Sequence, residues 1–386
     1  MSTLRIVQLV NTLAHADGGP ARNSFELNLA FNSLPHTVAA LVWMRGSTKA
    51  TVASDFAAQG GTLPPIPPRK LGFRRPGGGS IAWLDLFRLV QSADAVVIHG
   101  YFLAWVPLFA LLARGLGKPV FLMPHGALTP HELRIGARKK RLFRRAFRFA
   151  IGNDSMTIVT GSETERDDIS VIESEVPVKW AGVGTRPPIH RPQPRDLSAP
   201  IRLLTMSRLA PKKRVDLAIR AVAILRERGL DVALHIAGEG PSVVVDQLRE
   251  IARELGVTDR VHLHGLVTGP AKEELLFSSD VFLLPSEDEN FGIAVAEATA
   301  HGLLVVASDR VAAAAMLSAR VASLTSELNP SSIADAVEKT IGSYVPECRS
   351  LASTEAANSY SWTAVAGRWR GIIAEELSTR SPGIAP

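Results

Sequence analysis

The stretch that decides the fold is VFLLPSEDENFGIAVAEATA, residues 281–300. Its first four residues form an apolar, β-prone run, which is typical of a buried strand. A polar segment follows, and alternating alanines then favour a helix from about Gly292 that packs closely on its sheet. The stretch therefore predicts a strand–loop–helix unit whose polar residues lie at the carboxyl end of the strand.

The same alternation of strands and helices extends through the rest of the chain. Short runs that are apolar on both faces predict parallel sheets covered by helices on both sides. In the first half the expected strands are residues 5–10, 37–43, 95–99, 119–123 and 156–160. In the second half they are residues 202–206, 232–237, 261–264, 281–284 and 303–307. The sequence therefore predicts an α/β protein with two domains.

A proline-rich polar segment separates the two series of strands. Residues 187–194 read PPIHRPQP, which is typical of an extended connector. A length of 386 residues also suits two domains better than one. We expect an N-terminal domain over residues 1–186, a linker over 187–200, a C-terminal domain over 201–360 and a last amphipathic helix over 361–379.

Composition and charge limit the class of protein. The chain is 46% hydrophobic, as in soluble globular proteins, and its single cysteine, Cys348, fits a reducing compartment. No apolar run reaches the length of about 20 residues that a spanning helix needs, and the N-terminus does not resemble a signal peptide, so we expect a cytoplasmic protein. Residues 1–190 are basic and the remainder is mildly acidic. Nucleic acid, an anionic membrane surface or a phosphorylated substrate could therefore bind the first half.

Two cations follow the first strand of the second half. Ligands of parallel α/β sheets bind beyond the carboxyl ends of the strands, which makes Arg208 and Lys213 candidate site residues. The arginine can form a bidentate fork and the lysine a point charge, so both can converge on one anion such as a diphosphate. A merely solvated basic turn would be the better interpretation if this motif stood alone.

Two glutamates flank the helix start after residues 281–284. A helix from about Gly292 would direct the N–H groups of Asn290, Phe291 and Gly292 at a ligand. Glu289 precedes this helix and Glu297 lies in its second turn, so the two carboxylates can reach opposite ends of one ligand. Alternatively, Glu289 only complements the helix dipole and Glu297 is an exposed helix residue.

Glycines follow the first strand of the chain. Gly18 and Gly19 precede a helix expected from about Ala21, where backbone N–H groups can approach an anion closely, although a tight turn explains the glycines equally well. No GxGxxG follows any strand, which argues against a dinucleotide oxidoreductase. Residues 60–80, rich in proline and glycine, predict a long loop that is either functional or a tolerated insertion.

Taken together, these motifs resemble the retaining glycosyltransferases of family four. The resemblance covers nearly the whole chain. It rests on the Glu-x7-Glu arrangement of Glu289 and Glu297, SRLAPKKR (207–214), IAGEGP (236–241), VHLHGLV (261–267) and the early GGP loop. The resemblance implies the GT-B fold, two facing Rossmann-like domains with the C-terminal helix returning to the first. It also implies that a hexosyl unit passes from a nucleotide-diphosphate sugar, UDP- or GDP-linked, to a glycan or lipid-linked acceptor in polysaccharide or glycolipid biosynthesis, with retention of configuration.

The resemblance also implies roles for individual residues. Arg208 and Lys213 would hold the donor diphosphate, Glu297 the ribose, and Glu289 the hydroxyls of the donor sugar. The segment PHGAL (124–128) resembles the histidine-glycine loop of the family, so His125 would reach the donor sugar. Further donor-binding residues would be the backbone of Asn290, Phe291 and Gly292, the turn of Gly265, Leu266 and Val267 beside the base, and Gly18 and Gly19 beneath the phosphates. The chain departs from the family over residues 309–313, where a glycine-bearing loop is expected.

The same residues bear on cofactors and on alternative functions. No Asp-x-Asp follows a strand and the histidines lack ligand spacing, so we expect no metal and no cofactor, with fixed protein charges stabilising the leaving diphosphate. A nucleotide-sugar epimerase of the same fold is the alternative enzyme. We expect no nucleic-acid partner, because few aromatic residues interleave with the cations, and the intact Arg208, Lys213, Glu289 and Glu297 disfavour an inactive scaffold.

A strongly basic segment lies in the first half. Residues 134–150, RIGARKKRLFRRAFRFA, carry eight Lys and Arg with no acid. This favours a protein that docks peripherally on the inner face of a membrane through the Arg138–Arg148 region and the loop of residues 69–75. Alternatively, the apolar stripe packs on its own sheet and the cations are only solvated. The stripe expected from helical spacing comprises Leu142, Phe143, Ala146, Phe147 and Ala150.

Overall fold

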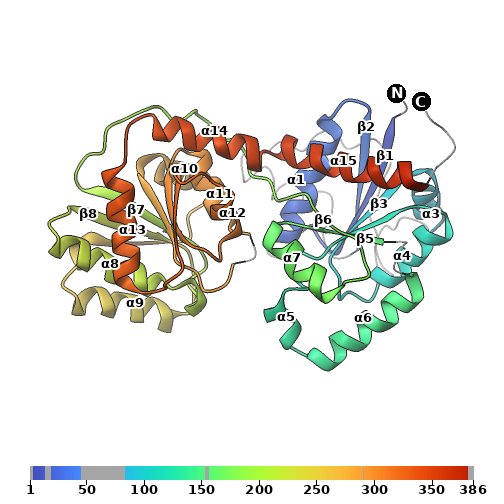
Figure 1. Ribbon diagram of the computed structural model, residues 1–386, viewed down its shortest axis with the longest axis horizontal. Helices are drawn as coiled ribbons and strands as arrows, with labels where there is room; N and C mark the ends of the chain where they lie inside the picture. Colours follow the sequence, from blue (N-terminus) through green and yellow to red (C-terminus); the bar gives the residue numbers. More distant parts are fainter. Residues whose placement is uncertain (1–2, 14–18, 45–82, 153–155, 290, 381–386) are drawn as a thin grey trace. The chain divides into compact units, whose positions relative to one another are not determined.

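The computed structural model describes residues 3–13, 19–44, 83–152, 156–289 and 291–380. The chain divides into two compact units, one formed by Met1–Gly184 with Trp362–Pro386 and the other by Thr185–Ser361. Over these described ranges each unit contains a six-stranded parallel sheet with helices on both faces (Figure 1). The predicted α/β class with two parallel sheets is confirmed.

In the N-terminal unit the sheet order reverses between β1 and β3. The strands are β1 (Leu4–Val10), β2 (Thr37–Trp43), β3 (Ala95–His99), β4 (Val120–Met123), β5 (Met156–Thr160) and β6 (Val178–Trp180). They are hydrogen-bonded in the order β2-β1-β3-β4-β5-β6. Chain connections diverge from such a reversal, so the carboxyl ends of β1 and β3 form a topological switch point, where α/β sheets bind ligands.

Helices cover both faces of this sheet. They are α1 (Gly19–Ser33), α3 (Trp83–Ser92), α4 (Val106–Gly115), α5 (Pro130–Arg134), α6 (Ala137–Ile151), α7 (Glu163–Ile172) and the C-terminal α15 (Trp362–Arg380). Leu86, Phe109 and Phe147 of α3, α4 and α6 belong to the main apolar core on one face. On the other face, the rings of Phe31 in α1 and Trp369 in α15 meet edge to face, with centroids 6.3 Å apart. The C-terminal helix thus packs within this unit, beside α1 (Figure 1).

In the C-terminal unit the sheet order reverses between β7 and β10. The strands are β7 (Ile201–Met206), β8 (Val232–Ala237), β9 (Val261–Gly265), β10 (Val281–Leu284), β11 (Leu304–Ser308) and β12 (Ala322–Thr325). Their order is β12-β11-β10-β7-β8-β9, and every pair is parallel. The loops after β7 and β10 therefore meet at the switch point of this sheet.

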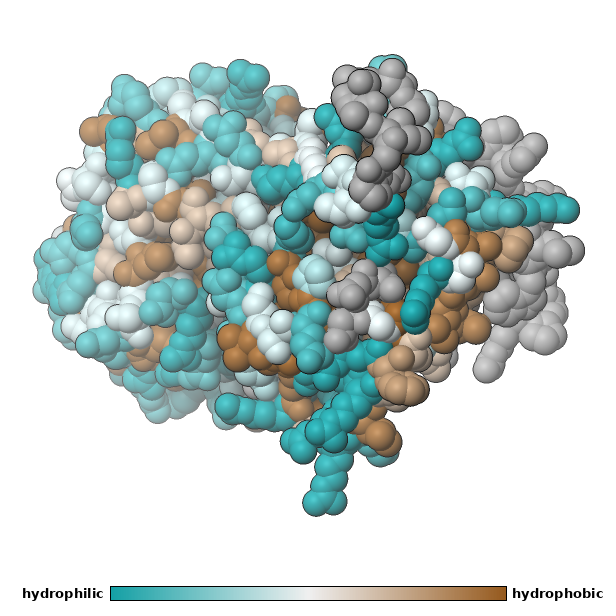
Figure 2. Space-filling view, turned by 45° about the vertical axis from the view of Figure 1, so that its right-hand side comes forward, coloured by the Kyte–Doolittle hydropathy of each residue, from teal (hydrophilic) through white to brown (hydrophobic). Residues whose placement is uncertain are grey.

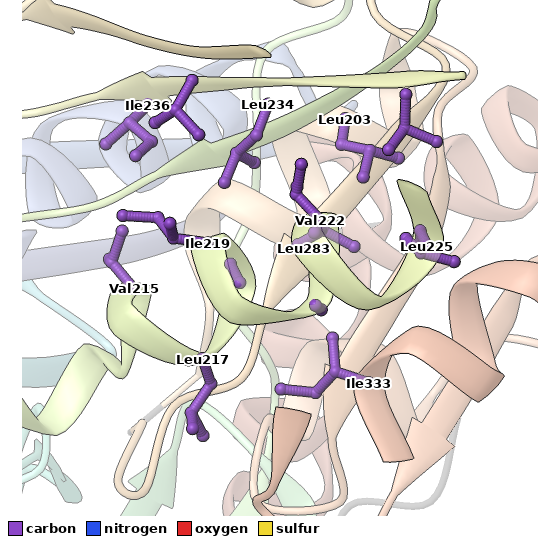
Figure 3. Close-up of a cluster of buried hydrophobic side chains, with 14 of the residues drawn as sticks. Leu203, Val215, Leu217, Ile219, Val222, Leu225, Leu234, Ile236, Leu283 and Ile333 are labelled. Carbon is purple, nitrogen blue, oxygen red and sulfur yellow. The ribbon is translucent and has the colours of Figure 1, made fainter. Parts of the chain in front are cut away.

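The core of the C-terminal unit lies between its sheet and a helical layer. The helices are η3 (Pro211–Lys213), α8 (Val215–Glu227), α9 (Ser242–Glu254), η4 (Thr258–Arg260), α10 (Gly269–Ser278), α11 (Ile293–Ala300), α12 (Ala312–Ala315), α13 (Pro330–Gly342) and α14 (Cys348–Tyr360). Figure 3 shows Val222 of α8 between Leu234 of the sheet and Ile333 of α13. Burial of each such side chain stabilises the fold by about 1.5–3 kcal/mol. No helix within the described residues is both long and apolar enough to cross a membrane.

Candidate functional site

Ion pairs join the loops after β7 and β10 at the switch point of the C-terminal unit. The N–H of Glu287 donates to the carbonyl of Lys212 at 2.8 Å, which brings the two loops side by side. Three consecutive cations then pair with three consecutive acids: Lys212 with Asp288 at 2.8 Å, Lys213 with Glu289, and Arg214 with Glu287 at 2.7 Å. The structure thus brings together two motifs that are far apart in the sequence.

The middle pair, Lys213 and Glu289, is the most buried of the three. Its side chains are 10% and 19% exposed, against 41% and 43% for the pair of Lys212 and Asp288. Removing one partner from such a desolvated pair leaves a charge that water cannot fully stabilise. Arg208 is exposed, and it makes no ion pair with any residue that the structure describes. Among the described residues of the loop after β7, Arg208 is therefore a cation without an ion pair, whereas Lys213 is paired.

Two glycines of IAGEGP allow the ends of β7 and β8 to approach closely. A Cβ on Gly238, whose φ is +149°, would lie 1.8 Å from the carbonyl oxygen of Ser207. A Cβ on Gly240 would lie 2.3 Å from that of Leu209, whose N–H donates to Glu239 at 2.7 Å. Only glycine fits either position without moving the Ser207–Lys213 segment.

Residues 309–313, where the chain departs from the family pattern, support the loop after β10. The N–H of Ala313 donates to the carbonyl of Phe291 at 2.8 Å, and Val311 forms a β-bridge with Glu289. Gly292 has a φ of +92°, and a Cβ there would lie 2.7 Å from Val311 Cγ1. This left-handed residue caps α11, which therefore begins at Ile293.

Glu297 is buried in the second turn of α11. Its carboxylate accepts from Lys272 Nζ at 2.7 Å, so the interpretation of Glu297 as an exposed helix residue is wrong. Lys272 lies in the first turn of α10, which follows the turn of Gly265 and Leu266. No sequence motif indicated Lys272, because its contact with Glu297 exists only where α10 and α11 lie side by side.

His125 lies at the carboxyl end of β4 in the N-terminal unit, next to His99 at the end of β3. His99 Nδ1 lies 3.0 Å from His125 Nε2, and His99 Nε2 lies 2.9 Å from Gln8 Oε1 of β1. Burial lowers the pKa of His125 to about 4 and holds that of His99 well below its usual range. Both imidazoles are therefore neutral near pH 7. For His99, the available signal in the sequence was its position at the end of a strand predicted to be buried.

Glu165 holds the backbone of the histidine-glycine loop. Its carboxylate accepts from the N–H of Gly126 at 2.8 Å and from that of Gly161 at 2.9 Å. Ser162 and Glu165 form the S-x-x-E pattern of a helix capping box at the start of α7, and Ser162 Oγ accepts from the Glu165 N–H at 3.0 Å. The glutamate would normally bond the N-cap N–H, but here it bonds the preceding glycine and a distant loop. Burial raises the pKa of this carboxyl group.

Some predicted site residues lie outside the described residues. These are Gly18, Asn290 and the loop of residues 69–75 within residues 60–80. Gly19 is the first residue of α1, so this helix begins two residues before its expected start. In the described part of the chain, no group of three or more His, Cys, Asp or Glu residues is arranged to hold a metal ion.

Most of the basic segment forms one helix, α6, and its exposed face differs from the prediction. α6 begins after Gly136, which has a φ of +67°. Leu142 is 70% exposed and Ala146 is also exposed, so placing both on one buried stripe was wrong. The buried stripe is narrower and comprises Phe147 and Ile151, with Phe143 partly buried.

The cations of α6 also fall into two groups. Arg144 and Arg148 pair with the buried Glu173 that follows α7, at 3.3 Å for Arg148, so neither is merely solvated. The outer face instead carries Arg138, Lys139, Arg141 and Arg145 beside Leu142 and Phe149, the last 94% exposed. Figure 2 shows hydrophilic and hydrophobic side chains mixed in the lower part of the view, the height at which Figure 1 places α6. We call these six residues the α6 outer face.

Two family models match the chain. Residues 188–355 match the model described as "Glycosyl transferases group 1", and residues 18–177 match the "Glycosyl transferase 4-like domain". The first range contains the ion-paired loops after β7 and β10, and the second contains the histidine-glycine loop.

Curated relatives match parts of the chain. A GDP-mannose:cellobiosyl-diphosphopolyprenol alpha-mannosyltransferase of Komagataeibacter xylinus is 26% identical over 188 residues, which cover 47% of each chain. A GDP-mannose-dependent alpha-(1-6)-phosphatidylinositol dimannoside mannosyltransferase of Mycobacterium tuberculosis is 31% identical over 181 residues, 47% of this chain and 46% of that one. The chain thus spans about half the length of these two relatives.

Solved structures match nearly the whole chain at low identity. A glycosyltransferase from Rickettsia africae has a TM-score of 0.70 at 14% identity, covering 98% of this chain and 99% of that one. Anabaena HepE in complex with UDP has a TM-score of 0.68 at 16% identity, covering 96% and 100%. At such identities the similarity concerns the fold, and the predicted GT-B fold is confirmed.

Proposed function

We propose that this chain, in which a glycosyl transferase 4-like domain precedes a group 1 glycosyl transferase domain, is a retaining glycosyltransferase. It would transfer a hexosyl unit from a nucleotide-diphosphate sugar to a glycan or lipid-linked acceptor, without a metal ion or other cofactor. The observation that carries the proposal is the ion pair of Lys213 and Glu289 at the switch point of the C-terminal sheet, in which Lys213 belongs to the same loop after β7 as Arg208. There, cations for a diphosphate and a carboxylate for sugar hydroxyls occupy one end of one sheet.

Lys213 would serve both the diphosphate and the donor sugar. A carboxylate next to a diphosphate would repel it, and a lysine bonded to that carboxylate removes most of the repulsion. We assign Arg208 and Lys213 to the diphosphate and Glu289 to the hydroxyls of the sugar. The backbone of Asn290, Phe291 and Gly292 at the start of α11 would add N–H donors and the positive end of the helix dipole.

The nucleoside would bind on the other side of the loop after β10. Glu297 would accept hydrogen bonds from the ribose hydroxyls, and the turn of Gly265, Leu266 and Val267 would flank the base. Lys272, bonded to Glu297 at 2.7 Å, supports this assignment because it offsets the charge of the carboxylate and holds it in place. Gly18 and Gly19 would lie beneath the phosphates.

The chemical step would depend on fixed protein charges. Cleavage of the bond between the anomeric carbon and the diphosphate oxygen leaves negative charge on the diphosphate, and Arg208 and Lys213 would stabilise it by about 3 kcal/mol each. We assign no covalent nucleophile, since a carboxylate bonded to a lysine, as in Glu289, attacks poorly. The acceptor hydroxyl would attack on the face that the diphosphate leaves and give its proton to the departing diphosphate oxygen, which retains the configuration. His125 would contact the donor sugar.

The class of acceptor is inferred from the relatives and from α6. The Komagataeibacter relative is named for a diphosphopolyprenol acceptor and the Mycobacterium relative for a phosphatidylinositol one, and both names specify GDP-mannose, whereas Anabaena HepE was crystallised with UDP. The α6 outer face mixes cations with exposed Leu142 and Phe149, the combination that binds anionic membrane surfaces. We therefore propose a lipid-linked acceptor and peripheral attachment to the inner face of a membrane, through this face and the loop of residues 69–75.

A donor screen tests the proposal. UDP-glucose, UDP-galactose, UDP-GlcNAc and GDP-mannose are compared by thermal shift, since a ligand at 100 times its Kd stabilises a protein by about 2.7 kcal/mol. The responding donor is then incubated with lipid-linked acceptors, and free nucleotide, glycoside anomer and epimerised sugar are measured. We expect a glycoside with the anomeric configuration of the donor, at an unchanged rate in EDTA. Epimerised sugar without glycoside, or complete loss in EDTA restored by Mg²⁺ or Mn²⁺, would contradict the proposal.

A further inference from the structure

A continuous line of hydrogen-bonded side chains runs from α1 to His125 across the carboxyl ends of β1, β3 and β4. Gln8 Nε2 donates to Asn28 Oδ1 at 3.1 Å, Gln8 Oε1 faces His99 Nε2 at 2.9 Å, and His99 Nδ1 faces His125 Nε2 at 3.0 Å. Gln8 and His99 are fully buried. Buried polar groups of this kind are costly unless every donor meets an acceptor.

The direction of each hydrogen bond follows from the Gln8 end of the line. Because the amide nitrogen of Gln8 donates to Asn28, its oxygen faces His99 and accepts from Nε2–H. A neutral imidazole protonated on Nε2 carries a lone pair on Nδ1, so His99 accepts from His125. The proton of His125 therefore lies on Nε2, and its Nδ1 bonds no other residue in the described ranges.

The neutral state of both rings and the loop geometry support a single arrangement. Burial keeps the pKa of His125 at about 4, so the ring is an imidazole rather than an imidazolium near pH 7. His125 and Gly126 both have positive φ, 52° and 84°, and Glu165 holds the Gly126 N–H at 2.8 Å. The backbone and one ring nitrogen are thus fixed by separate partners, which leaves the other nitrogen with one orientation.

We propose that His99, supported by Gln8, is a positioning residue that keeps the proton of His125 on Nε2 and leaves the Nδ1 lone pair for a hydroxyl group of the donor sugar. The inference rests on the proposed role of His125 in the donor site. A hydroxyl can donate to Nδ1 only while that nitrogen is unprotonated; in the other tautomer Nδ1–H would be the donor, and the hydroxyl could only accept.

Two substitutions at position 99 separate this role from packing. Asn places an amide oxygen near the position of imidazole Nδ1, so His99→Asn can still accept from His125, whereas His99→Leu cannot. The first readout needs no substrate: two-bond ¹H–¹⁵N spectra of ¹⁵N-histidine protein at pH 7.5, with His125 identified by its loss in His125→Ala. We expect the Nε2–H tautomer in wild type and His99→Asn and a mixture in His99→Leu. An Nδ1–H tautomer in wild type, or the same pure tautomer in His99→Leu, overturns the inference.

The second readout is coupling between the two histidines. With the donor found in the screen, we expect kcat/KM to fall about tenfold in His99→Leu and to change by less than about threefold in His99→Asn. In the His125→Ala background, His99→Leu should have no further effect, because a residue that acts through His125 has nothing left to position. An equal fall in both backgrounds would mean a structural role only. If no donor reacts with wild type, the proposed function fails, whereas the NMR result still decides the tautomer.

Discussion

The two units place their candidate site residues at equivalent positions in their sheets, but these residues are charged in one unit and neutral in the other. In the C-terminal unit the reversal between β7 and β10 brings together ionised groups, with Lys213 paired to Glu289. In the N-terminal unit the reversal between β1 and β3 brings together neutral groups, with Gln8 bonded to His99. Topology therefore determines where a ligand can bind, whereas the side chains that end the strands determine its chemistry. The cations of the C-terminal unit suit a diphosphate, and the neutral imidazoles of the N-terminal unit suit sugar hydroxyls.

The largest expected effect tests the charged half of this comparison. Arg208→Ala and Lys213→Ala should each lower kcat/KM for the donor by at least about 100-fold, because in the proposed mechanism each cation would stabilise the leaving diphosphate. Lys212→Ala is the matched control, since its pair with Asp288 is exposed, and it should change kcat/KM by less than about twofold. Near-normal rates in both Arg208→Ala and Lys213→Ala would remove the charged site from the mechanism.

The second largest expected effect distinguishes the proposed roles of the two glutamates in the C-terminal unit. Glu297→Gln should weaken the binding of UDP or GDP, measured by calorimetry, about tenfold or more, because it would remove the carboxylate proposed to accept from the ribose hydroxyls. Glu289→Gln should lower kcat while leaving nucleotide affinity within about threefold. Glu274→Gln, on the exposed surface of α10, is the control. Unchanged nucleotide affinity in Glu297→Gln would show that the ribose binds elsewhere.

The third effect concerns charge on the surface of the N-terminal unit. Reversal of Arg138, Arg141 and Arg145 to Glu should lower binding to anionic vesicles about tenfold in cosedimentation, and binding should fall from 50 to 500 mM salt as the Debye length shortens about threefold. Arg144 and Arg148 are left unchanged because they pair with the buried Glu173. The control reverses Arg249 and Arg253, exposed on α9. Equal binding to neutral and anionic vesicles, or none to either, would contradict membrane docking.

The smallest effect is the pH dependence of stability. Burial lowers the pKa of His125 and of His235 in β8 from 6.5 to about 4. Between these values the unfolded chain binds protons that the native chain does not, so the free energy of unfolding should fall as pH falls from 6.5 towards 4. His125→Gln or His235→Gln should each make this decline shallower, by up to about 1.4 kcal/mol per pH unit in urea unfolding. Glu165, with its raised pKa, acts in the opposite direction. If the free energy of unfolding falls with pH at the same slope in the variants and in wild type, the histidines do not contribute as proposed.

The buried parts of the fold could be predicted from the sequence. Strands that are apolar on both faces, such as β3, β8 and β10, have the bounds expected from their hydrophobic runs. Such strands are continuous apolar runs, and the polar residues that follow define their ends. The edge strands β6 and β12 were missed. They are short; every residue of β6 is only partly buried, and β12 is buried only at its first and last residues, so both strands lack that signal.

The contacts between distant segments could not be predicted. Helical spacing placed Leu142 with Phe147, but α6 contacts α4 and α5 along a narrower stripe, and Leu142 lies outside it. The motifs indicated Lys213 and Glu289 separately, whereas their pairing depends on two loops that meet only in the folded sheet. His99 and Lys272 were missed for the same reason, since each is defined by the partner that it bonds.

The shared carboxylate of Glu165 makes one cooperative unit of two segments that are distant in the sequence. The start of α7 and the histidine-glycine loop cannot open separately without leaving a buried oxygen of this residue unbonded. The amide protons of Gly126 and Gly161 should therefore exchange with solvent at matching rates, and Glu165→Ala should release both together. The order of the loop that carries His125 therefore depends on a glutamate in the capping box of α7.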